Sequence, residues 1–134
     1  MLEYNVENLK IVIEIIKKNL SIDLLPKKLI SKNKNNPMFG HCYNFAGCLY
    51  KIFGCKQVKL YRGFDGEIYH WWVQDNYGKI IDPSSEQYTI LGKLPPYDKA
   101  EKSYPLPLDY RKRINILYEK VVNQLKNNTL TKSK

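Results

Sequence analysis

The chain has 134 residues, of which 43% are hydrophobic and 13% aromatic, which is enough for the core of one domain. Its formal net charge is +9, and the excess lies on the flanks: residues 1–36 carry +3 and residues 93–134 carry +6, whereas residues 37–92 are neutral. Three cysteines cannot all pair, which favours a reducing compartment. The sequence has no apolar run that would span a membrane and no secretory leader, so we expect a soluble, cytoplasmic protein without a membrane partner.

The first expected element is an amphipathic helix over residues 6–20, with Asn5 as a candidate N-cap. Its apolar side chains recur at helical spacing and predict one buried stripe: Val6, Leu9, Ile13, Ile16 and Leu20. Residues 21–39 are rich in Asn and contain two prolines, which predicts an irregular connection.

A second helix is expected from about Cys42 to Phe53, because apolar residues recur at three and four positions and Gly54 follows as a stop. Cys48 falls on the apolar stripe of this helix and is expected in the core, and Cys55 is also expected to be structural. Cys42 falls in the first turn, where unpaired backbone N–H groups and the positive end of the helix dipole favour a thiolate. This position makes Cys42 a candidate nucleophile.

Three strands follow, and the register of the last two brings His70 close to Asp82. Residues 57–61 and 67–74 predict strands, with a loop over 62–66, and residues 79–82 predict a return strand after a turn. A three-residue hairpin loop that ends in a left-handed Gly78 would pair Trp72 with Asp82. His70 would then lie diagonally across from Asp82, with backbones about 7–8 Å apart, a gap that the two side chains can bridge.

Prolines in residues 94–97 and 104–107 interrupt regular structure, and a last helix is expected from about Asp109 to Lys126, with a frayed tail from about Asn127. No linker or internal repeat divides the chain, so we expect one domain over residues 1–134.

Cys42, His70 and Asp82 follow one another at spacings of 28 and 12 residues, in segments that resemble a known family. The runs Asn-Pro-Met-Phe-Gly-His-Cys-Tyr at 36–43, His-Trp-Trp at 70–72 and Asp-Pro-Ser at 82–84 are similar to the catalytic core of the transglutaminase-like branch of the papain-like superfamily. They also resemble short phage and bacterial proteins with a GHCY…HWW…DP pattern. The resemblance covers roughly residues 24–90.

The resemblance implies an α+β fold: a cysteine at a helix N-terminus, packed on a small antiparallel sheet that carries His and Asp, with flanking N- and C-terminal helices. By resemblance, Cys42 is the nucleophile, His70 the base and Asp82 the group that orients it. The implied activity is a cysteine-dependent amide hydrolase or acyltransferase: an amidase, deamidase, peptidase or transglutaminase-like enzyme. Its substrate would be an amide-containing protein, peptide or small molecule, and no cofactor is expected. The papain-type oxyanion glutamine upstream of the cysteine is absent.

Polar and aromatic residues near these motifs are candidates for substrate binding. Trp72 shares the parity of His70 and is expected to form a wall of the cleft, and Gln87 is a polar residue shortly after the motif. The full set of candidates is Asn36, His41, Tyr43, Trp72 and Gln87.

Two other interpretations use some of the same residues. Metal binding is disfavoured, because the gaps of five and six residues between cysteines differ from the short knuckles of structural zinc sites. A non-catalytic basic module could instead bind nucleic acid or an acidic partner through its flanks, for example through Arg111, Lys112 and Arg113. The oligomeric state is left open.

Overall fold

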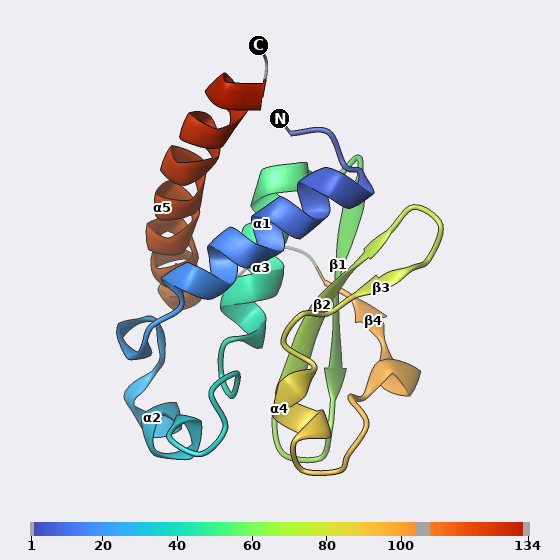
Figure 1. The fold of residues 1–134 in the computed structure, drawn as a ribbon. Coiled ribbons are helices and arrows are strands. Elements are labelled where there is room, and N and C mark those ends of the chain that lie inside the picture. Colours follow the sequence, from blue (N-terminus) through green and yellow to red (C-terminus); the bar gives the residue numbers. More distant parts are fainter. Residues whose placement is uncertain (1, 104–107, 133–134) are drawn as a thin grey trace.

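In a computed structural model, helices pack against a four-stranded antiparallel sheet, so the fold is α+β as expected (Figure 1). The structure describes residues 2–103 and 108–132, with the side chains of residues 108–111 and 128–132 excepted.

The helices that carry the core begin where the sequence predicts. Helix α1 (Val6–Asn19) is capped by Asn5, whose side chain accepts a hydrogen bond from the backbone N–H of Asn8 at 2.8 Å. Helix α3 (Cys42–Phe53) ends at Gly54, which has a φ of +83°, a conformation that glycine adopts without strain.

Several local elements differ from the prediction. The connection after α1 contains a 3₁₀ turn η1 (Ile22–Leu24) and helix α2 (Lys27–Asn33), and short helices α4 (Glu86–Thr89) and η2 (Tyr97–Lys99) follow the sheet hairpin. Such one- or two-turn elements are too short to show a periodic pattern. Helix α5 spans Leu108–Lys132, so it continues past Asn127, where a frayed tail was expected. The proline-containing segment 104–107 lies outside the described residues.

The sheet has the strand order β3-β2-β1-β4, with β1 (Val58–Phe64), β2 (Tyr69–Asp75), β3 (Ile80–Ile81) and β4 (Glu101–Lys102). Strand β1 continues past Tyr61, where a loop was expected, because residues 62–64 pair with the start of β2. Strand β4 was not predicted, since two exposed residues carry no alternating pattern.

The register of the β2–β3 hairpin is the one that the turn residues predict. Val73 pairs with Ile81 and Gln74 with Ile80, so the next pair outward joins Trp72 to Asp82. The turn closes through a 3.1 Å hydrogen bond from the Asp75 N–H to the Lys79 carbonyl, and Gly78 has a φ of +82°.

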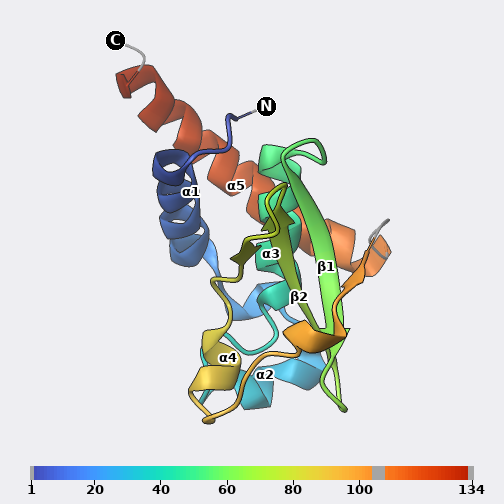
Figure 2. The ribbon, with the colours of Figure 1, turned by 90° about the vertical axis from the view of Figure 1, so that its right-hand side faces the viewer.

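Helix α3 occupies the centre of the molecule, between the sheet on one side and α5 on the other (Figure 2). Its apolar side chains share one core with those of α1, α5, β1 and β2, and the largest fully buried members include Phe45, Leu49, Phe53, Ile16, Ile114 and Leu117. The N-terminal end of α3 points toward the end of the molecule where α2 and α4 lie (Figures 1 and 2). The packing therefore directs Cys42 toward these two short helices.

Candidate active site

His70 and Asp82 form a buried hydrogen-bonded pair, as the hairpin register predicts. The His70 Nε2 lies 2.6 Å from Asp82 Oδ2, and the two side chains are 0% and 3% exposed. Because a carboxylate can only accept, Nε2 carries the proton and the other ring nitrogen, Nδ1, faces away from Asp82. The contact holds the imidazole in one tautomer and one orientation.

Two hydroxyl groups hold the Asp82 carboxylate on its other sides. The Ser84 hydroxyl donates to Oδ1 at 2.9 Å, and the Tyr97 hydroxyl donates to Oδ2 at 2.6 Å. Burial and the hydrogen bond to Asp82 raise the pKa of Tyr97, so this hydroxyl keeps its proton and remains a donor. Sequence reasoning missed Tyr97, which follows a proline pair in a segment without periodic pattern.

The second neighbour of the imidazole is the Cys42 thiol. Burial opposes charging of His70, but the hydrogen bond to Asp82 and then the interaction with Cys42 outweigh it and raise the pKa of His70 to about 9. Among the described residues, Nδ1 has no hydrogen-bond partner. The structure therefore brings together all three residues that the sequence pattern singles out.

Tyr88, from α4, packs on the imidazole from another side. Its ring meets the His70 ring edge to face, with centroids 4.8 Å apart, and its hydroxyl donates to Asp65 Oδ2 at 2.6 Å. Partial burial raises the pKa of Asp65, but hydrogen bonds from Tyr88 and from the backbone of Ile68 and Glu67 outweigh it, so the net shift is downward. Tyr88 and Asp65 thus restrain the imidazole, and no motif in the sequence indicated either residue.

Cys42 opens onto a cavity of about 280 Å³, which we call the Cys42 cavity. Tyr43 lines it and packs on Trp71, with ring centroids 4.3 Å apart, and Lys28 and Glu67 bring charge to an otherwise mainly apolar and aromatic wall. The remaining lining residues are Leu29, Gly40, Phe64, Ile68 and Tyr69. Among the substrate-binding candidates, Tyr43 is the one placed on this wall.

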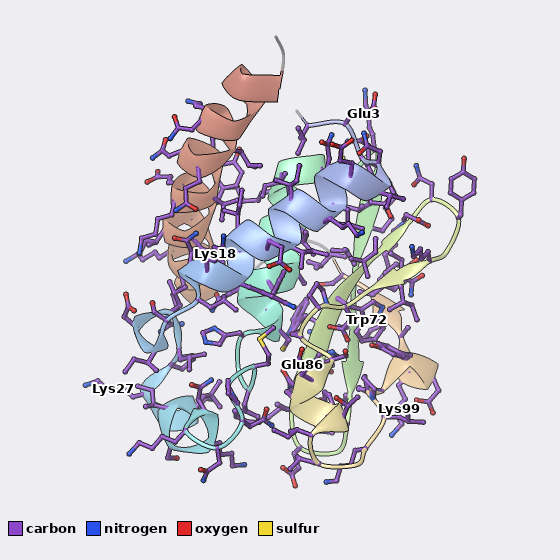
Figure 3. The ribbon with its side chains drawn as sticks, viewed as in Figure 1. Glu3, Lys18, Lys27, Trp72, Glu86 and Lys99 are labelled. Atoms are coloured by element: carbon purple, nitrogen blue, oxygen red, sulfur yellow. The ribbon has the colours of Figure 1, made fainter. Side chains whose placement is uncertain are left out.

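Trp72 lies behind the imidazole instead of on the wall of the Cys42 cavity. It is 1% exposed, its ring centroid lies 5.8 Å from that of His70, and it meets Tyr97 edge to face at 5.1 Å. Figure 3 shows Trp72 among the strands, enclosed by neighbouring side chains. Because neighbouring strand residues point to opposite faces, Trp71, one residue earlier, lines the Cys42 cavity.

Asn36 and Gln87 line a second cavity of about 420 Å³, which we call the Gln87 cavity. The Asn36 side chain donates to the backbone carbonyl of Gln87 at 2.8 Å, which ties the segment before α3 to α4. The two cavities share Glu67 and Ile68, so they are adjacent at the loop that joins β1 to β2.

His41 precedes Cys42 but lines a third cavity, of about 410 Å³, between the end of α1 and α4. It is 3% exposed, and burial lowers its pKa to about 4, so the ring is neutral at physiological pH. The structure does not bring His41 to the Cys42 cavity.

The other cysteines differ from Cys42. Cys48 is fully buried in the core, as expected, and burial raises the pKa of its thiol to about 12. Cys55, which follows the end of α3, is exposed and is not packed in the core. Among the described residues, no group of three or more His, Cys, Asp or Glu side chains is arranged to hold a metal ion.

The basic side chains are distributed over several elements. Lys18, Lys27 and Lys99 project from α1, α2 and η2 at well-separated positions (Figure 3). Of the cluster on α5, Lys112 is exposed and Arg113 partly buried, whereas the side chain of Arg111 lies outside the described residues. Within residues 2–103 and 108–132, no helix combines the length and apolarity needed to cross a membrane.

No protein-family model matches the chain, and neither a curated protein nor a solved structure shows significant similarity to it. The inference of function therefore depends on the site itself.

Proposed function

We propose that this chain is a thiol enzyme with a transglutaminase-like or papain-like arrangement, which hydrolyses or transfers an acyl group at an amide-type bond. Cys42 is the nucleophile, His70 the general acid and base, and Asp82 the residue that orients the imidazole. One observation carries the proposal: a buried imidazole is hydrogen-bonded to a buried carboxylate at 2.6 Å and also interacts with a thiol from a helix N-terminus.

The charges of the site suit acyl transfer. With a pKa of about 9, His70 is protonated at neutral pH, and an imidazolium beside Cys42 favours the thiolate. The thiolate attacks the amide carbon and pushes the carbonyl electrons onto oxygen. When the tetrahedral intermediate collapses, the C–N bond breaks and the leaving nitrogen takes its proton from His70.

The neutral imidazole then removes a proton from water or from an acceptor amine, which attacks the thioester and releases Cys42. The backbone N–H of Cys42 is in the first turn of α3 and has no intrahelical acceptor, so it can donate to the oxyanion. The Cys42 cavity gives the substrate access to the sulfur. Its size suits one ring or a short aliphatic chain next to the scissile bond, since whole-ligand pockets usually measure about 300–1,000 Å³.

The test is the rate at which iodoacetamide alkylates Cys42 at pH 6, in a Cys55→Ser background that removes the exposed thiol. We expect Cys42 to react faster than glutathione although it is only 4% exposed, and His70→Gln to remove that advantage. Site-localised mass spectrometry after a pulse of p-nitrophenyl acetate should also find the acetyl group on Cys42. Alkylation no faster than that of glutathione, without an acetyl adduct, would contradict the proposal.

A further inference from the structure

Gln87 lines the Gln87 cavity and carries a buried side-chain oxygen that has no hydrogen-bond partner among the described residues. The residue is 2% exposed, and the oxygen is Oε1. A buried acceptor without a partner is rare in folded proteins, because it has lost its hydrogen bonds to water without replacing them. A rotation of the Gln87 side chain toward the cavity would let an N–H group of a ligand replace them.

The surroundings of Gln87 favour a neutral ligand. Two carboxylates, Asp65 and Glu67, and two ammonium groups, Lys32 and Lys93, line the Gln87 cavity, so its formal charge balances. The Asp65 carboxylate already accepts the Tyr88 hydroxyl and two backbone N–H groups. The other walls are largely apolar and include Phe39, Ile68, Leu91 and Leu94.

The Gln87 cavity is also adjacent to the catalytic residues of the proposed enzyme. Tyr88, the residue after Gln87, lines the cavity and packs against His70, while Glu67 and Ile68 line both this cavity and the Cys42 cavity. The Gln87 cavity and the Cys42 cavity are therefore neighbours.

We propose that the Gln87 cavity is a second substrate subsite, which binds a neutral carboxamide group remote from the bond that Cys42 attacks. The Gln87 carboxamide supplies both an acceptor and a donor, which complement the N–H and C=O of an amide. The inference rests on the proposed function for the identity of the substrate, but binding at Gln87 is measurable without any reaction.

The binding test uses the Cys42→Ser protein and N-acetylglycinamide, with N-isobutylacetamide as a ligand of similar shape that lacks the terminal amide. Two-dimensional NMR follows the side-chain NH₂ signals of Gln87, assigned by their loss in Gln87→Met. We expect N-acetylglycinamide to shift these signals saturably and N-isobutylacetamide to bind at least fivefold more weakly. Gln87→Met should weaken the binding of N-acetylglycinamide to a similar extent. In this variant the backbone amide signal of Ile68 reports the binding. Asn35→Leu, which changes an exposed carboxamide at the rim of the same cavity, is the matched control and should bind nearly as the parent does.

Equal affinity for the two ligands, or an unchanged affinity in Gln87→Met, would overturn the subsite. Should Gln87→Met fail to fold, Gln87→Glu keeps the volume and replaces the donor by a charge, and is expected to weaken N-acetylglycinamide binding similarly.

A second measurement separates this inference from the proposed function. Chloroacetamides with a terminal carboxamide on linkers of one to four methylenes are compared with their isopropyl-ended counterparts, in the Cys55→Ser protein. At one linker length, we expect the chloroacetamide with the terminal carboxamide to alkylate Cys42 about tenfold faster than its isopropyl-ended counterpart. This difference in rate should disappear in Gln87→Met. Slow alkylation by every probe together with saturable binding at Gln87 would contradict the proposed enzyme and leave the carboxamide site in place.

Discussion

The hydroxyl of Tyr97 and the Nε2 of His70 meet at the same oxygen of Asp82, each at 2.6 Å. The three residues come from η2, β2 and the end of the β2–β3 hairpin, so the carboxylate joins parts of the chain that are otherwise separate. We expect Tyr97→Phe to lower the free energy of unfolding by about 1–2 kcal/mol, because a buried charged acceptor loses one donor. Urea unfolding at pH 7 measures this loss.

The same Tyr97→Phe variant should slow alkylation of Cys42 only a few-fold, since Ser84 and His70 still hold Asp82. Asp82→Asn is the stronger change, because the amide cannot favour the imidazolium, and it should slow alkylation more. If Tyr97→Phe slowed the reaction as much as Asp82→Asn does, the hydroxyl would have a role beyond holding the carboxylate.

The dependence of stability on pH should reveal the His70–Asp82 pair. The pKa of His70 is raised from an ordinary value of 6.5 to about 9, so between these values the folded state binds a proton that the unfolded state has released. Its contribution, up to about 3 kcal/mol, is complete below pH 6.5 and is lost as pH rises through about 9. Urea unfolding from pH 6 to 9.5, in a Cys42→Ser background that removes the titration of the thiol, should therefore show a decline that is shallower in Asp82→Asn. Parallel curves for the two proteins would show that Asp82 does not raise this pKa.

Gly63 allows η2 to approach the sheet. A Cβ at Gly63 would lie 2.4 Å from the carbonyl oxygen of Pro96 and 3.1 Å from the Trp72 ring, so Gly63→Ala must displace the segment that carries Tyr97. We expect a loss of about 1–3 kcal/mol, as is typical of overpacking. A double-mutant cycle with Tyr97→Phe measures the coupling between Gly63 and Tyr97. The losses in free energy of unfolding of the two single variants should add to more than the loss in the double variant. Full additivity would mean that Gly63 acts independently of the Tyr97–Asp82 contact.

Single substitutions of the three cysteines should have different effects on stability and on acylation. Cys48→Ala opens a cavity among fully buried side chains and should lower the free energy of unfolding by about 1–2 kcal/mol. Cys55→Ser changes an exposed side chain and should alter it by less than about 0.5 kcal/mol. Cys42→Ala should preserve the fold while it abolishes acylation by p-nitrophenyl acetate. Thermal and urea unfolding of the three proteins provide the comparison, and equal losses for Cys48→Ala and Cys55→Ser would contradict the assignment of Cys48 to the core.

Local sequence determined the elements on which the candidate triad depends. The extent of α3 from Cys42 to Phe53 follows from its helical periodicity and from the stop at Gly54, and the hairpin register follows from the turn that ends at Gly78. A shift of one residue in that register would move His70 to the opposite face from Asp82, so the turn chemistry alone made their contact predictable.

Only the tertiary structure decided what surrounds these residues. Tyr97, Tyr88 and Asp65 reach the site from short, aperiodic segments that are brought there by packing across the sheet and around α4. The same packing buries Trp72 and leaves Trp71 on the wall of the Cys42 cavity. Strand alternation predicts that the two side chains point to opposite faces of the sheet, but it does not predict which face borders the cavity. Periodicity reports which residues share a face, because it depends on backbone geometry along one element. Which side chains close a cavity depends on the contacts between elements, which are distant in sequence and leave no local pattern.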